Sequence, residues 1–267
     1  MTGLSEHIDA LNRQGRKALS VFLTAGYPEP DGFVPLALDV FAAGADMLEI
    51  GIPFSDPIAD GPVIQRASQK SLAAGMTIDK IFGYASDIRR ETDKPLILMG
   101  YANPILRYGI DRFIHASRDC GIKGFIVPDI PLEEYDAFWS HPPDDIDVIQ
   151  LTTPVSPDKR IRAIDARSRG FVYCVSITGT TGGGTGSDRQ TINHIRNTYR
   201  LIDRNKMMIG FGISNPADVH RFAPYCDGVI VGSAVIKRLN PENKDRKQGT
   251  AIDLVRELSS ACDIAGN

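Results

Sequence analysis

The sequence alternates between short apolar runs and longer stretches with the spacing of amphipathic helices. The runs are rich in aliphatic and β-branched residues and predict eight strands, at residues 19–24, 47–50, 95–99, 124–127, 147–151, 171–176, 207–211 and 228–231. Most are apolar at consecutive positions, which is typical of strands buried on both faces of a parallel sheet. The sequence between them predicts helices at residues 32–43, 61–74, 77–91, 110–120, 132–139, 157–167, 188–199, 215–222, 234–239 and 251–265.

The length of the chain favours a closed barrel over an open sheet. The 267 residues provide about 33 residues for each strand–helix unit, and a (β/α)8 barrel typically uses about 250 residues in all. An open, doubly wound sheet would carry a G-x-G-x-x-G turn after its first strand, whereas residues 25–28 read Ala-Gly-Tyr-Pro. No shift in composition marks a domain boundary. We therefore predict a single α/β TIM-barrel domain over residues 1–267, with an extra helix before the first strand and another between strands two and three.

Charge and composition narrow the classes of function. The net charge of −3 argues against binding to nucleic acid or to anionic membranes. No apolar stretch reaches the roughly 18 residues of a membrane span, and residues 1–19 resemble an amphipathic helix more than a signal peptide. The cysteines are scattered without a C-x-x-C pair, at Cys120, Cys174, Cys226 and Cys262. This pattern favours reduced thiols and therefore a cytoplasmic protein.

Two carboxyl groups lie where a barrel enzyme holds its reacting groups, at and after the C-terminal end of a strand. Glu49 lies inside an apolar run between Leu48 and Ile50. Desolvation there would raise its pKa and suit proton transfer, and the alternative is a rim carboxylate paired with a basic residue. Asp60 lies on the long loop that follows. A catalytic role and an N-cap role before Gly61 both remain open for Asp60.

Small residues follow the last three strands and predict a phosphate site. Gly212 follows the seventh strand, and Gly232 and Ser233 follow the eighth, which are the loops that commonly bind phosphate in barrels together with a helix N-terminus. Five glycines between residues 179 and 186 allow close approach to a ligand, but no P-loop lysine follows them. Tight turns and a flexible connection are the alternatives.

The positions of the lysines and histidines argue against two classes of catalytic mechanism. A Schiff-base enzyme needs a lysine at the C-terminal end of a strand, whereas Lys94, Lys123 and Lys206 precede their strands. A zinc site needs clustered histidines and carboxylates. The histidines lie on predicted helices or on loops at the helix side, at His7, His115, His141, His194 and His220. Acid–base chemistry by carboxyl groups on a phosphorylated substrate is what remains.

Residues 48–62, Leu-Glu-Ile-Gly-Ile-Pro-Phe-Ser-Asp-Pro-Ile-Ala-Asp-Gly-Pro, closely resemble the signature of the tryptophan synthase alpha subunit family. Further matches lie at residues 101–104, 128–131, 211–214 and 232–234, so the resemblance spans nearly the whole chain. It implies a (β/α)8 barrel that cleaves indole-3-glycerol phosphate to indole and glyceraldehyde 3-phosphate, without metal or cofactor. It also implies an α2β2 heterotetramer with a pyridoxal-phosphate-dependent beta subunit, which receives the indole.

The resemblance also assigns roles to residues of the motifs. Glu49 would be the general acid and base, Asp60 would accept a hydrogen bond from the indole N–H, and Tyr173 would complete the catalytic group. The implied substrate-binding residues are Phe22, Tyr101, Thr181 and Phe211. The implied phosphate-binding residues are Gly182, Gly212, Gly232 and Ser233.

The loop after the sixth strand departs from the family pattern. Six residues, 183–188, separate Gly182 from Arg189, so the loop is longer and richer in glycine than expected. Because extra glycines raise the entropy cost of ordering a loop, we expect slower closure over the substrate and greater dependence on the partner.

Other functions stay open at this point. A lyase that needs no partner and a sugar-phosphate isomerase would use the same barrel, and a regulatory subunit could bind phosphate without catalysis. The presence of Glu49, Asp60 and Tyr173 argues against the regulatory subunit, because that subunit would not need them.

Overall fold

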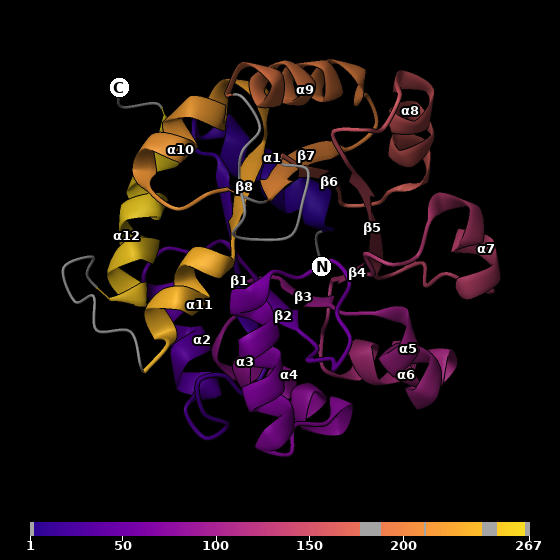
Figure 1. Cartoon of the computed structure of the whole chain (residues 1–267), viewed down its shortest axis with the longest axis vertical. Coiled ribbons are helices and arrows are strands. Elements are labelled where there is room, and N and C mark those ends of the chain that lie inside the picture. The colour runs from indigo at the N-terminus through magenta and orange to yellow at the C-terminus, as the bar shows by residue number, and fades with distance from the viewer. Residues whose placement is uncertain (1–2, 177–187, 211, 242–249, 265–267) are drawn as a thin grey trace.

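The computed structural model describes residues 3–176, 188–210, 212–241 and 250–264. Within these ranges eight parallel strands close into a barrel in chain order, with β8 pairing to β1 (Figure 1). The strands are β1 (Ala18–Thr24), β2 (Met47–Gly51), β3 (Leu96–Met99), β4 (Gly124–Ile126), β5 (Asp147–Thr152), β6 (Phe171–Val175), β7 (Lys206–Gly210) and β8 (Gly228–Val231). The predicted (β/α)8 barrel is confirmed, and each strand boundary lies within one residue of its prediction.

Helices surround the strands in Figure 1. The first six are α1 (Leu4–Arg13), α2 (Phe33–Ala42), α3 (Pro62–Ala73), α4 (Ile78–Glu91), α5 (Ala102–Tyr108) and α6 (Ile110–Asp119). The others are α7 (Tyr135–Phe138), α8 (Asp158–Arg167), α9 (Asp188–Leu201), α10 (Pro216–Phe222), α11 (Ser233–Leu239) and α12 (Ala251–Ala261), with 3-10 turns at Leu132–Glu134 and Ala223–Tyr225. The two extra helices predicted, α1 before β1 and α4 between β2 and β3, are both confirmed. Among the residues that the structure describes, none of the helices could span a membrane.

Helix α5 was not predicted from the sequence. Pro104 suggests a turn, but it lies in the first turn of α5, where backbone N–H groups have no partner within the helix and proline is tolerated. The Asp129 carboxylate, from the loop after β4, accepts the Ala102 N–H at 3.0 and 3.2 Å. The start of α5 is therefore held by a residue distant in the sequence.

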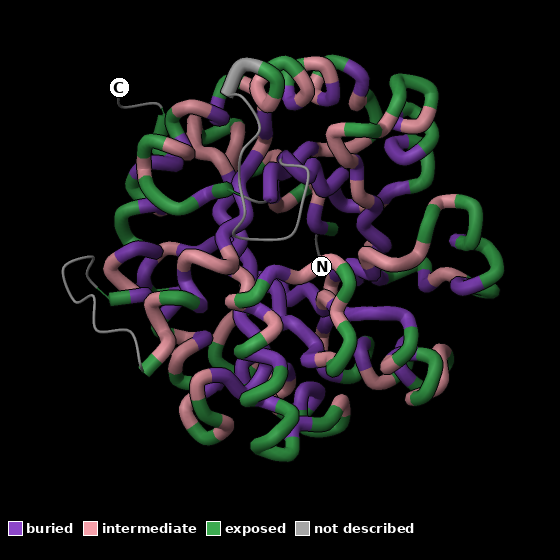
Figure 2. Tube along the Cα trace, viewed as in Figure 1, coloured by how far each residue is buried: buried purple, intermediate pink, exposed green. Residues whose placement is uncertain are grey.

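The buried apolar side chains of the described residues form two cores, and the strands are buried from both sides (Figure 2). The larger core lies between the barrel and the surrounding helices. The smaller core lies within the barrel, where Leu4 and Ile8 of α1 pack against inward residues such as Met47 and Ile97. The Leu4 N–H donates to Asp147 at the start of β5, so α1 covers the N-terminal end of the barrel.

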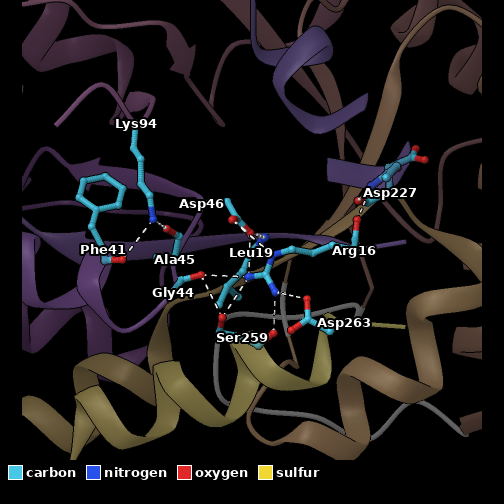
Figure 3. Close-up of polar contacts among 11 residues, drawn as sticks. Arg16, Leu19, Phe41, Gly44, Ala45, Asp46, Lys94, Asp227, Ser259 and Asp263 are labelled. Carbon is cyan, nitrogen blue, oxygen red and sulfur yellow. Dashed lines mark hydrogen bonds and ion pairs between the residues drawn. The ribbon is translucent and has the colours of Figure 1, made fainter. Parts of the chain in front are cut away.

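A polar network occupies this N-terminal end (Figure 3). Arg16, just before β1, donates to the Asp46 carboxylate at 3.2 Å, to the Gly44 carbonyl at 3.0 Å and to the Asp263 carboxylate at 2.6 Å. It also donates to the carbonyl and hydroxyl oxygens of Ser259 on α12. The network therefore ties the beginning of the barrel to the last helix.

Candidate active site

Glu49 is a buried carboxyl group in the middle of β2. Its side chain has no exposed surface. The Ser20 hydroxyl on β1 donates to Oε1 of Glu49 at 2.8 Å, and Oε2 has no hydrogen-bond partner among the described residues. Burial raises the pKa of Glu49 to about 7, although the hydrogen bond from Ser20 acts in the opposite direction. The polar partner of Glu49 is thus a hydroxyl group, not the basic side chain of the alternative interpretation.

Asp60 lies on the loop between β2 and α3 and turns toward the next strand. The Tyr101 hydroxyl donates a hydrogen bond to its carboxylate and accepts one from the Ala59 N–H at 3.1 Å. Burial raises the pKa of Asp60 to about 6. The N-cap interpretation is wrong, because α3 begins with Gly61 as its cap and without a side-chain hydrogen bond. The carboxylate is engaged by Tyr101 instead.

Tyr173 lies on β6, in the barrel interior. Burial and the negative charges of Glu49 and Asp60 raise the pKa of its hydroxyl, which is therefore neutral at neutral pH. A Cβ atom at Gly210 on β7 would lie 2.0 Å from the Tyr173 hydroxyl oxygen. The missing side chain at residue 210 is thus what makes room for this phenol beside the two carboxyl groups.

One cavity brings the predicted residues together. It is lined by seven of them, Phe22, Glu49, Asp60, Tyr173, Gly212, Gly232 and Ser233. Tyr101 borders an adjoining cavity that shares Phe22 and Asp60 with the first. Thr181, Gly182 and Phe211 lie outside the described residues, as does the glycine-rich loop whose closure was expected to be slow. The cavity combines two carboxyl groups of raised pKa with an apolar wall and a glycine-rich wall.

The glycine-rich wall comes from the loops after β7 and β8. Gly212 has a φ of +82°, a conformation that residues with a side chain rarely adopt. Gly232 precedes Ser233, the first residue of α11, and a Cβ atom at Gly232 would lie 3.3 Å from the Phe22 Cβ. Small residues at both positions therefore leave the backbone accessible from the cavity.

The lysines considered for Schiff-base chemistry lie at the opposite end of the barrel, as predicted. The Lys94 ammonium group donates to the carbonyl oxygens of Phe41 and Ala45 at 3.1 and 2.6 Å (Figure 3). Lys206 pairs with Asp9 of α1 at 2.6 Å, and Lys123 directly precedes β4. None of the three borders the cavity.

Comparison with known proteins decides the family. The sequence model of the family described as "Tryptophan synthase alpha chain" matches residues 8–262. The chain belongs to the tryptophan synthase alpha chain family. The tryptophan synthase alpha chain of Chloroflexus aurantiacus is 42% identical over 269 residues, and the match covers 98% of each chain.

Solved structures of this family have the same fold. The tryptophan synthase alpha chain from Legionella pneumophila superimposes with a TM-score of 0.84 at 31% identity, covering 100% of this chain and 99% of the other. A chain of Mycobacterium tuberculosis tryptophan synthase gives a TM-score of 0.84 at 30% identity, covering 97% of this chain and 98% of the other. The tryptophan synthase alpha fold is therefore shared over essentially the whole chain.

Several residues at the site were missed from the sequence. The cavity also has an apolar lining, formed by Ile64, Met99, Ile213 and Ile230. Ser20, which holds Glu49, was missed as well. Its position could have signalled it, because Ser20 lies two residues before Phe22 on the same strand and alternate residues of a strand share a face.

Proposed function

We propose that this chain carries out the tryptophan synthase alpha reaction with Glu49 as the proton carrier. The reaction cleaves indole-3-glycerol phosphate to indole and glyceraldehyde 3-phosphate. The observation that carries the proposal is the buried Glu49 carboxyl group at the cavity, which has a pKa of about 7 and one oxygen without a hydrogen-bond partner among the described residues. A group that titrates near neutral pH can both donate and accept a proton during turnover.

The proton returns to Glu49 at the end of each cycle. Protonated Glu49 donates its proton to C3 of the indole ring, which leaves a positive charge on the ring nitrogen. The Glu49 carboxylate then accepts the proton of the hydroxyl on the carbon attached to C3. That carbon becomes the aldehyde of glyceraldehyde 3-phosphate, the carbon–carbon bond breaks, and its electron pair restores the aromatic indole. The net change is the transfer of one proton from the hydroxyl to C3.

Asp60 stabilises the charge that develops on the ring. Its carboxylate, oriented by the Tyr101 hydroxyl, accepts a hydrogen bond from the indole N–H. This role needs ionised Asp60, whereas the first step needs protonated Glu49. The pKa values of about 6 for Asp60 and about 7 for Glu49 favour that combination near neutral pH. The neutral Tyr173 hydroxyl is assigned to the same catalytic group.

The remaining assignments divide the cavity into an apolar part and a phosphate part. Phe22 and Tyr101 flank the indole ring, while Gly212, Gly232 and Ser233 bind the phosphate. Thr181 and Phe211 are proposed to contact the substrate, and Gly182 the phosphate, from outside the described residues. The strands and helices described all belong to one barrel, which supports a single domain over residues 1–267.

A second chain is proposed to use the indole. The family pairs with the tryptophan synthase beta subunit, and we assign this chain to the same α2β2 heterotetramer. All four cysteines are buried and free, which is compatible with a reducing cytoplasm.

The test is indole release from indole-3-glycerol phosphate by the purified chain, with and without a tryptophan synthase beta subunit. We expect release that depends on the partner, and its loss in Glu49→Gln. Glu91→Gln, the same change at an exposed position of α4, is the matched control and should behave as wild type. Normal cleavage by Glu49→Gln would refute the mechanism. Full release without the partner would indicate an independent lyase, and substrate binding without release would indicate a regulatory subunit.

A further inference from the structure

Ser20 carries a hydroxyl group inside the barrel, on the strand next to Glu49. In the register of β1 and β2, Ser20 pairs with Met47 and Phe22 pairs with Glu49. Because alternate residues of a strand share a face, Ser20, Phe22 and Glu49 project into the same interior space. Ser20 has no exposed surface, so its hydroxyl cannot exchange the bond to Glu49 for one to bulk water.

The bond makes the two oxygens of the Glu49 carboxyl group unequal. Oε1 accepts the Ser20 hydroxyl at 2.8 Å, while Oε2 has no partner in the described part of the chain. The other groups around Glu49 offer little polar alternative. Tyr173 from β6 and Asp60 from the loop after β2 are the titratable groups of this space, whereas Met99 and Ile230 contribute apolar atoms from β3 and β8.

We propose that Ser20 is a positioning residue for the reaction: its hydroxyl fixes Oε1 of Glu49, so that Oε2 is the oxygen that exchanges the proton with the substrate. The inference rests on the proposed role of Glu49. Ser20 is not among the residues that line the cavity, so it acts through Glu49 and not on the substrate itself.

The hydroxyl also affects the protonation of Glu49. A hydrogen bond donated to a carboxylate favours the ionised form, so Ser20 lowers the pKa of Glu49 while burial raises it. Loss of the hydroxyl should raise the pKa of Glu49. Because the first step needs protonated Glu49, the limb of kcat/KM that falls at high pH should then move to higher pH.

Three variants at residue 20 distinguish positioning of Glu49 by the Ser20 hydroxyl from a role of Ser20 in packing. Ser20→Ala removes the hydroxyl, and Ser20→Thr and Ser20→Val are a nearly isosteric pair with and without it. We expect Ser20→Ala and Ser20→Val to lower kcat about tenfold or more, with KM changed less than about twofold, and to move the upper pH limb by about one pH unit. Ser20→Thr should restore most of kcat and the original limb. Ser20→Ala keeps the test valid if the larger valine disturbs folding.

An unchanged pH limb and kcat in a folded Ser20→Ala variant would overturn the inference, as would equal impairment of Ser20→Thr and Ser20→Val. A purely structural role would lower the thermal midpoint without moving the limb. The Glu49→Gln variant is measured in parallel. If Glu49→Gln is inactive while Ser20→Ala is normal, only the positioning role fails. If Glu49→Gln is active, the proposed function itself fails.

Discussion

Asp46 and Glu49 are three residues apart, and both are buried, yet their surroundings differ. Asp46, just before β2, is 8% exposed and accepts hydrogen bonds from the Arg16 guanidinium and from the Leu19 N–H (Figure 3). Glu49, within β2, has no exposure, a single hydrogen bond and one oxygen without a partner among the described residues. The buried charge of Asp46 is compensated by its hydrogen bonds, which hold the N-terminal end of the barrel together. Glu49 is buried without such compensation, which has a cost in stability, and we propose that it is kept in the interior for proton transfer.

A third buried carboxyl group resembles Asp46. Asp165 on α8 is 4% exposed and accepts hydrogen bonds from three consecutive backbone N–H groups, those of residues 203–205. The Asn205 side chain donates to it as well. A buried acid is therefore not by itself a sign of function in this protein. The distinguishing property of Glu49 is an oxygen with no hydrogen-bond partner in the part of the chain that the structure describes.

The largest expected effect comes from Glu49→Gln. The rate of cleavage should fall by about 10²–10⁴-fold or more, because general acid–base catalysis is lost. The pKa of Glu49 is raised from about 4.5 to about 7 on folding, so its contribution to stability is fully present below about 4.5 and is lost as the pH rises through about 7. The amide escapes that loss, so the variant should be more stable at pH 8 by on the order of 3 kcal/mol.

Urea denaturation at pH 8 and at pH 5 measures this difference in the free energy of unfolding. The gain should shrink at pH 5, where Glu49 is protonated in the folded wild-type protein. A variant that is less stable than wild type at pH 8 would show that Glu49 is a compensated structural carboxylate like Asp46.

Arg16→Gln, at the N-terminal end of the barrel, should lower stability and leave cleavage nearly unchanged, which is the opposite of the result for Glu49→Gln. Asp46 would lose its ion pair in a largely buried position, which should lower the free energy of unfolding by about 3 kcal/mol. The rate of cleavage per folded molecule should stay within about twofold. Arg13→Gln is the matched control, because its ion pair with Asp9 is exposed and should contribute less than about 1 kcal/mol. A loss of kcat in a folded Arg16→Gln variant would contradict a purely structural role for the network at the N-terminal end of the barrel.

The smallest effect expected is a narrow pH optimum. The proposed mechanism needs ionised Asp60 and protonated Glu49, so kcat/KM should fall below about 6 and above about 7. Asp60→Asn cannot ionise, so kcat/KM should be lower at every pH, and its residual activity should lack the lower limb while the upper limb stays. A lower limb retained in Asp60→Asn would assign that limb to another group.

The barrel could be predicted from the sequence because the pattern that indicates each strand is local. Consecutive apolar residues predict strands buried on both faces, and the same pattern identified Glu49 as desolvated. The contrast between Asp46 and Glu49 could not be predicted, because it depends on which donors reach each carboxyl group. Arg16 and Ser20 are about 30 positions away, and their pairing depends on the barrel register.

The surroundings of Asp60 could not be predicted from the sequence for a similar reason. Spacing alone left the N-cap interpretation open, and its actual partner, Tyr101, comes from the end of the next strand. The start of α5 was missed for the same reason, because Asp129, which accepts the N–H of its first residue Ala102, follows β4. Contacts between neighbouring strand ends are the part of this site that sequence patterns do not contain.

The protonation midpoint of Glu49 in the wild-type protein tests its proposed role most directly. Its side-chain carboxyl carbon can be followed by ¹³C NMR as the pH is varied, with Glu49→Gln to assign the signal. We predict a midpoint near 7, well above that of an exposed glutamate. A midpoint near 4.5, the ordinary value, would show that Glu49 is not the uncompensated acid on which the mechanism depends.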